Sequence, residues 1–221
     1  PLDMFFRAIG RRFKVGQKPF LPRQPAAASI SPRGFQTTSI AMDGNYRAPL
    51  KEMNFVLNDV FDVESHYKKM EHTGGSEVDS EFVMQVMEAH ASFCEETLGP
   101  LNAVGDEHGG EWIDEHTVKT PPGYKEAYDI YVEGGWQGLS NSEEYGGQGL
   151  PYSLSLFAAD MAATANFTWT MYPGLSKGCI NTMVSHASDE LKDKYLARLV
   201  SGEWTGTMCL TEPQCGSDLG Q

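Results

Sequence analysis

The sequence predicts a mainly α-helical fold that changes to β structure close to its last residues. From Tyr46 onward, apolar residues recur at the three- and four-residue spacing of amphipathic helices. From Trp204 to Thr211 the spacing becomes a strict alternation that includes β-branched residues, which is typical of a strand. We therefore expect a helical domain over residues 43–202 and the start of a β domain over residues 203–221.

Four helical segments carry the first pattern, each with an apolar stripe that should face a core. In order, the stripes are Leu50, Met53, Leu57, Val60 and Phe61; Phe82, Val86, Met87 and Phe93; Tyr128, Ile130 and Tyr131; and the apolar run at residues 154–165. The second segment opens at Ser80, and the third ends at Gly134. Gly, Pro and acidic residues are frequent at 72–79 and 105–123, so we predict surface loops there.

A fifth helix is predicted to begin after Ser188, a good N-cap residue. The acidic side chains of Asp189 and Glu190 complement the positive end of the helix dipole, and Gly202 is a typical stop. The residues expected to face the core are Leu191, Tyr195, Leu199 and Val200.

Residues 1–42 differ in charge from the rest of the chain. They hold seven basic residues and one acid, a net of +6, whereas the remaining ten bases and 29 acids give −19. Leu2, Phe5, Phe6, Ile9 and Phe13 would share one helical face, opposite Arg7, Arg11, Lys14 and Lys18. This pattern predicts a disordered mitochondrial transit peptide and a mature protein in the mitochondrial matrix. The alternative is a basic amphipathic arm that lies on a membrane surface or a partner.

Composition argues against several functions for the rest of the chain. An acidic surface repels polyphosphate, so nucleic-acid binding is not expected. No run of about 18 apolar residues is present, so we expect no membrane span. The four cysteines, Cys94, Cys179, Cys209 and Cys215, form no CxxC pair, and the scattered histidines show no metal-ligand spacing. Reduced thiols and no metal site are the expectation.

The polar residues that follow the predicted strand could bind a ligand. Pro213 should end the strand, and Gly216 would let a ligand approach the main chain. Successive N–H groups and the Ser217 hydroxyl could bind a phosphate, while the Thr211 hydroxyl could meet the polar edge of a heterocycle. Turn statistics alone favour a simple Gly-Ser-Asp turn.

Five stretches carry a resemblance, three of them to a family and two to one of its branches. CLTEPQCGSD, from Cys209 to Asp218, resembles the flavin-binding signature of the acyl-CoA dehydrogenases, although Cys215 replaces the usual small residue. GGWQGLSNSEEYGGQGLP and ELKDKYLARLVSG are similar to two further family segments, in the family's order. YRAPLKEMNFVLNDVFD and VKTPPGYKEAYDIYVEGGW resemble the branch that includes 3-methylthiopropanoyl-CoA dehydrogenase. The resemblance covers about residues 46–221 and implies the family's helical N-terminal domain followed by the start of its middle β domain.

The resemblance implies FAD-dependent α,β-dehydrogenation of an acyl-CoA thioester. A carboxylate removes the α-proton, and the β-hydride goes to flavin N5. The residues implied to line the isoalloxazine are Met208, Cys209, Leu210 and Thr211. Gly216 and Ser217 are implied to reach the pyrophosphate, and Ser217 also the CoA moiety. Electron-transferring flavoprotein is the implied electron acceptor, and the full-length protein is implied to be a homo-oligomer.

The catalytic base is implied to lie beyond Gln221. Glu212 is then a support of the loop and Asp218 a ligand of its own turn. We therefore expect the chain to be the front part of a longer protein and to lack dehydrogenase activity alone. The glycines at 146–149 do not match a dinucleotide fingerprint and predict a tight, close-packed turn. The alternatives are an acyl-CoA oxidase, a non-catalytic acyl-CoA-binding or interaction relative, and an unrelated helical interaction domain.

Overall fold

A computed structural model describes residues 46–70 and 78–220, and it confirms the mainly helical fold. The predicted transit peptide and most of the predicted loop at 72–79 lie outside these residues. The elements, in order, are α2 (Leu50–Asn54), a π-helix (Phe55–Val60), α3 (Val63–Tyr67), α4 (Ser80–Phe93), a π-helix (Cys94–Leu98), α5 (Gly99–His108), β1 (Glu111–Asp114), β2 (Thr117–Lys119), α6 (Tyr124–Glu133), 3-10 helices (Trp136–Gly138 and Glu143–Tyr145), α7 (Tyr152–His186) and α8 (Asp189–Ser201). In this described part, no helix is both long and apolar enough to cross a membrane.

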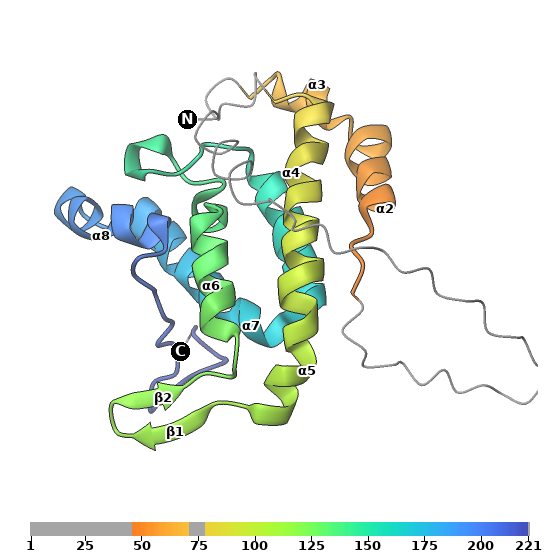
Figure 1. Cartoon of the computed structure of the whole chain (residues 1–221). Helices are drawn as coiled ribbons and strands as arrows, with labels where there is room; N and C mark the ends of the chain where they lie inside the picture. Colours follow the sequence, from red (N-terminus) through yellow and green to blue (C-terminus); the bar gives the residue numbers. More distant parts are fainter. Residues whose placement is uncertain (1–45, 71–77, 221) are drawn as a thin grey trace, which may run out of the picture.

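The longest helical unit without a break is α4 with its continuation through a π-helix into α5, which Figure 1 shows as one upright rod beside α6. The helix begins at Ser80, as the sequence predicts, and the Asp79 side chain accepts a hydrogen bond from the Phe82 N–H at 2.8 Å. This N-cap satisfies one of the free N–H groups of the first turn. Of the predicted stripe, Val86, Met87 and Phe93 are buried and Phe82 is half-buried, which confirms the predicted face of this helix.

The first predicted stripe is correct only in its first half. Met53 and Leu57 are buried, but Val60 is 56% exposed and Phe61 is 62% exposed. The reason is the π-helix between them, in which hydrogen bonds span five residues rather than four. The residues that follow are rotated off the α-helical stripe and face solvent.

The fourth predicted helix, residues 154–165, continues much further than its apolar run. α7 extends to His186, but Asn166 breaks it with φ −159° and ψ 87°. At the break, the second half of α7, residues 167–186, folds back along the first half. The hydrogen bond that Lys177 Nζ donates to Ser155 Oγ shows that the two halves lie side by side. In a straight helix these two residues would be about 33 Å apart.

The side chain of Asn166 stabilises this break. Its Oδ1 accepts hydrogen bonds from the Trp169 N–H at 3.0 Å and the Tyr124 hydroxyl at 3.3 Å, and its Nδ2 donates to the Leu98 carbonyl at 3.3 Å. Asn166 therefore acts as an internal N-cap for the second half of α7. It is completely buried, so the Asn-Phe-Thr sequon that it begins is not exposed for glycosylation.

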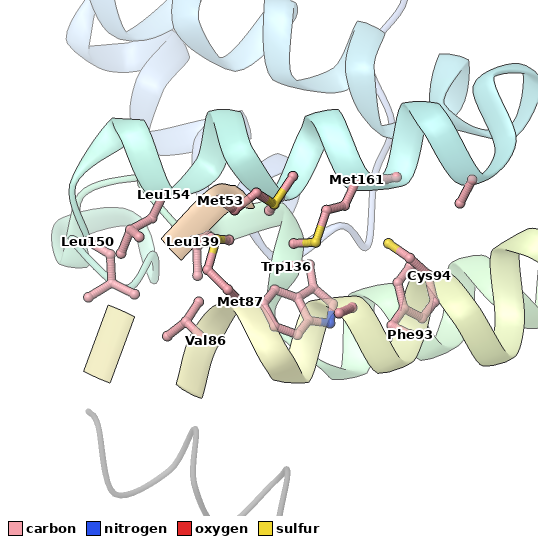
Figure 2. Close-up of a cluster of buried hydrophobic side chains, with 14 of the residues drawn as sticks. Met53, Val86, Met87, Phe93, Cys94, Trp136, Leu139, Leu150, Leu154 and Met161 are labelled. Carbon is pink, nitrogen blue, oxygen red and sulfur yellow. The ribbon is translucent and has the colours of Figure 1, made fainter. Parts of the chain in front are cut away.

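Two apolar cores follow from this arrangement. The larger one lies between α4, α6 and the first half of α7, and Figure 2 shows Met87 and Trp136 facing Leu154 and Met161 within it. The smaller one joins the second half of α7 to α8 through Ile180, Leu196, Leu199 and Val200. Ile130 and Leu191 were expected to face a core but are exposed. The buried residues of the same two helices include Ala127, three residues before Ile130, and Leu196, five residues after Leu191.

The β structure is not where the alternation predicts it. Residues 204–211 form no strand, and the sheet instead joins β1 to β2 as an antiparallel hairpin inside the predicted loop at 105–123. A strand needs a neighbour for its ladder hydrogen bonds, and the described part of the chain offers none to residues 204–211. The hairpin is exposed throughout, with Trp112 opposite Val118.

Candidate functional site

The candidate site is the C-terminal segment, residues 203–220, which leaves the helical body at Gly202. Gly202 has φ +80°, a conformation that ends α8 and that other residues rarely adopt. A Cβ there would be 2.6 Å from Val132 Cγ2, and the Tyr128 hydroxyl donates to the Gly202 carbonyl at 3.2 Å. Packing against α6 therefore fixes the direction in which the segment starts (Figure 1).

Trp204 holds the first residues of the segment against α8. Its N–H donates to the Arg198 carbonyl at 3.0 Å. The Arg198 guanidinium lies over the indole ring, 4.5 Å from its centroid, and the Tyr195 ring lies 6.0 Å away. Cation–π contacts of this kind contribute about 0.5–1 kcal/mol at exposed sites.

Gly206 makes the next contact, with the second half of α7. Its N–H donates to Ser176 Oγ at 3.0 Å, and its α-carbon lies against Cys179. Ser176 is fully buried and Gly206 is half-buried, so this hydrogen bond is partly shielded from water. The sequence did not reveal this contact, because it depends on α7 folding back at Asn166.

Beyond Gly206 the segment turns its groups toward solvent. Met208 is 60% exposed and Leu210 is 46% exposed. Among the residues that the structure describes, no backbone group pairs with the main chain of residues 207–211. Donors, acceptors and apolar side chains therefore remain available together, which suits a ligand with a flat heterocycle.

The two predicted ligand-binding clusters lie in contact with each other. The Glu212 N–H donates to the Cys215 carbonyl at 2.8 Å, which closes a turn between the clusters. As a result, a Cβ on Gly216 would be 3.3 Å from both Thr211 Oγ1 and Thr211 Cγ2. Gly216 has no positive φ, so glycine is not required at this position for its backbone angles. The close approach to Thr211 is the reason that the structure supplies.

The other predicted residues are accessible. Cys209, Thr211 and Ser217 are all exposed, so neither predicted hydroxyl is covered by the core. Asp218 Oδ1 accepts a hydrogen bond from the Gly220 N–H at 3.1 Å, which confirms that Asp218 is a ligand of its own turn. Glu212 contributes its main chain to the loop, as the N–H bond to Cys215 shows.

The glycines at 146–149 form the tight turn that the sequence predicts. A Cβ on Gly147 would collide with the Asn141 carbonyl, and Gly146 and Gly149 have positive φ. Gln148 Nε2 donates to the Gly135 carbonyl at 2.9 Å, which ties the turn to the end of α6.

Like Ser176, Lys177 is a residue that the sequence analysis did not select as a candidate. Its ammonium group is half-buried, bonds to Ser155 Oγ and lies 5.1 Å from the centroid of the Tyr152 ring. Burial disfavours the charged form and lowers the pKa of Lys177 below its usual value. Across residues 46–70 and 78–220, no group of three or more His, Cys, Asp or Glu side chains is arranged to hold a metal ion.

The chain is a helical domain followed by an exposed segment that carries Thr-Glu-Pro and Gly-Ser-Asp. Comparison with known proteins gives the family of this domain. The family model described as acyl-CoA dehydrogenase, N-terminal domain, matches residues 80–203. The chain therefore belongs to the acyl-CoA dehydrogenase family.

Individual relatives agree with this assignment. The chain is 36% identical over 175 residues to 3-methylmercaptopropionyl-CoA dehydrogenase of Ruegeria pomeroyi, covering 79% of this chain and 29% of the relative. It is 28% identical over 183 residues to a butyryl-CoA dehydrogenase of Syntrophomonas wolfei, covering 80% and 29%. It is 34% identical over 136 residues to a mitochondrial isovaleryl-CoA dehydrogenase of Oryza sativa subsp. japonica, covering 61% and 31%. The chain thus spans about three tenths of the length of these relatives.

Proposed function

We propose that the chain takes part in the FAD-dependent α,β-dehydrogenation of an acyl-CoA thioester, and that residues 208–217 bind the flavin. The observation that carries the proposal is the contact between Thr211 and Gly216. It brings an exposed hydroxyl, free main-chain groups and a Gly-Ser turn together in a chain of the acyl-CoA dehydrogenase family.

The residues present fit FAD in their chemistry. The main chain of residues 207–211 has no backbone partner among the described residues, so its N–H and C=O groups can meet the N–H and C=O groups of the isoalloxazine edge. Met208 and Leu210 are exposed apolar side chains beside them and can cover part of a flat ring. The Gly216-Ser217 turn supplies N–H groups and a hydroxyl for a phosphate.

Each residue then has a definite role. The Thr211 hydroxyl orients the polar edge of the ring, and Met208, Cys209 and Leu210 line the ring through their backbone. Gly216 and Ser217 hold the pyrophosphate, and the Ser217 hydroxyl also meets the CoA moiety. When bound, FAD would supply the acceptor for the β-hydride, at its N5 atom. The α-proton requires a carboxylate base, which we assign to residues beyond Gln221.

The names of the relatives bear on the substrate. They refer to 3-methylmercaptopropionyl, butyryl and isovaleryl groups, all of which are short acyl chains. We therefore propose a short-chain acyl-CoA as the substrate. Electron-transferring flavoprotein as the acceptor, a homo-oligomeric full-length protein and a location in the mitochondrial matrix are further proposals, the last resting on residues 1–42.

Titration of the 221-residue chain with FAD, followed by flavin fluorescence, tests the proposed site. We expect the wild-type chain to bind FAD and both Thr211→Ala and Ser217→Ala to weaken binding about tenfold, the effect of one lost hydrogen bond of about 1.4 kcal/mol. Thr205→Ala is the matched control, because it removes an exposed threonine from the same segment outside the site. Equal affinity in all four proteins, or no affinity in any, would contradict the proposal.

A turnover assay separates the enzyme from a non-catalytic acyl-CoA-binding relative. We expect the 221-residue chain alone to show no oxidation of butyryl-CoA by a dye acceptor, because we propose that the carboxylate base is not among its residues. Measured turnover by this chain would refute the assignment of the base. A full-length protein that binds FAD and butyryl-CoA without oxidising it would favour the binding relative.

A further inference from the structure

We infer that Ser176 and Gly206 are positioning residues that set where the flavin-binding segment lies on the helical body. The inference rests on the proposed function and extends it to two residues outside residues 208–217. The inference starts from the observation that few contacts hold residues 203–220 against the helical body. After Trp204, Gly206 makes the one hydrogen bond between the described part of this segment and the second half of α7.

The Ser176 hydroxyl is held in a fixed direction. Its Oγ donates to the Tyr172 carbonyl, one turn earlier in α7, at 3.2 Å. The hydrogen is therefore committed to the helix, and the oxygen accepts the Gly206 N–H at 3.0 Å. Ser176 is fully buried and Gly206 is half-buried, so the protein partly shields this hydrogen bond from water. The helix thus presents a single oriented acceptor to the segment.

Gly206 is the residue that lets the segment reach this acceptor. A Cβ at position 206 would be 2.5 Å from Cys179 Cβ and 2.9 Å from Cys179 Sγ. Both distances are well below van der Waals contact, so a side chain would push the segment off the helix. Glycine is required here for close approach and not for its backbone angles, because Gly206 does not have a positive φ.

Gly206 lies close in sequence to the residues of the proposed site, so its position affects theirs. Only one residue separates Gly206 from Met208, and only four separate it from Thr211. Since residues 207–211 have no backbone partner among the described residues, the Ser176 hydrogen bond is their nearest fixed point on α7. A shift at Gly206 therefore moves every group proposed to face the isoalloxazine.

Amide hydrogen exchange and FAD titration of the 221-residue chain test the inference. In Gly206→Ala and in Ser176→Ala we expect the amide of residue 206, which loses its hydrogen bond to Ser176, to exchange about tenfold faster and FAD to bind about tenfold more weakly. The midpoint of thermal unfolding should change little in Gly206→Ala, because the segment is exposed. A purely structural role would instead lower this midpoint and leave the FAD affinity of the folded chain unchanged.

A double variant and a matched control make the test specific. Cys179→Gly removes both atoms that would collide with a side chain at position 206, so Gly206→Ala combined with Cys179→Gly should recover most of the FAD affinity lost in Gly206→Ala. Gly178→Ala adds the same methyl group two residues from Ser176, where nothing lies within 4 Å, and should leave exchange and affinity unchanged.

The outcomes separate this inference from the proposed function. Unchanged exchange and affinity in Gly206→Ala, or no recovery in the double variant, would overturn the positioning role while leaving flavin binding intact. A wild-type chain that binds no FAD would refute the proposed function and the flavin part of the inference together. The exchange rates would still decide whether Ser176 anchors the segment.

Discussion

The helical body, residues 46–70 and 78–202, and the C-terminal segment, residues 203–220, are held in place by different means. In the body, most elements bury apolar side chains in one of two cores, so each is fixed by many weak contacts at once. The segment is largely exposed and is fixed by a few contacts at Gly202, Trp204 and Gly206. Substitutions in the body should therefore cost stability, whereas substitutions in the segment should cost ligand binding.

The same substitution in the two regions gives the largest expected contrast. Leu154 is fully buried in the larger core, and Leu154→Ala should lower the free energy of unfolding by about 3 kcal/mol. Leu210 is 46% exposed, and Leu210→Ala should change this free energy by less than about 0.5 kcal/mol. Urea denaturation of both variants checks the contrast, and comparable losses would mean that the segment is part of the cooperative core.

The break in α7 provides the next largest effect. Asn166→Ala removes two acceptor contacts and one donor contact from a buried site and leaves the Trp169 N–H, the Tyr124 hydroxyl and the Leu98 carbonyl without this partner. We expect a loss of about 2 kcal/mol in the free energy of unfolding. Thr164→Ala is the control, because Thr164 lies two residues away on the exposed side. Equal stability of the two variants would show that Asn166 does not hold the break.

The body should also respond to pH through His90. Burial of its ring lowers the pKa of His90 from 6.5 to about 4, and a smaller effect of the Ala158 backbone opposes this shift. Between pH 6.5 and 4 the unfolded chain therefore binds a proton that the folded chain does not. The stabilisation is complete above pH 6.5 and is lost as the pH falls, by about 1.4 kcal/mol per pH unit.

Urea denaturation at pH 7, 6 and 5 checks this prediction against His90→Phe, which keeps a ring beside Trp136 but cannot titrate. The free energy of unfolding of the wild-type chain should fall more steeply with decreasing pH than that of the variant. Parallel curves would assign the acid sensitivity to other groups.

The junction between the two regions gives the smallest effect on stability. Tyr128→Phe removes the hydrogen bond from the Tyr128 hydroxyl to the Gly202 carbonyl and keeps the ring. We expect a loss of about 1 kcal/mol. Tyr152→Phe removes an exposed hydroxyl elsewhere and is the control. A Tyr128→Phe variant as stable as this control would show that the hydroxyl does not contribute to the junction.

The difference between the helical body and the C-terminal segment also explains which features could be predicted from the sequence. α4 was predicted correctly from Ser80 onward because burial on one face leaves a periodic pattern. Val60 and Phe61 were predicted incorrectly because a change of hydrogen-bond spacing, from four residues to five, leaves no mark on the pattern of residue types. The break at Asn166 was missed because it is stabilised by contacts with α6 and the Cys94–Leu98 π-helix, which are distant in sequence.

In the segment, motif and geometry contributed different information. The motif located Thr211, Gly216 and Ser217, because their chemistry is local in sequence. The contact between Thr211 and Gly216, and the anchor from Ser176 to Gly206, depend on how the chain folds back and could not be inferred from residue types. The predicted strand at 204–211 was wrong for a related reason, since alternation describes a chain that can pair but does not supply its partner.

Amide hydrogen exchange of the wild-type chain, measured with and without FAD, tests the central claim most directly. The claim is that the exposed segment binds the flavin while the helical body carries the stability. We predict that FAD slows exchange in residues 204–218 and leaves the amides of α4 and the first half of α7 unchanged. Slower exchange confined to the helical body, or no change anywhere in the presence of saturating FAD, would contradict the claim.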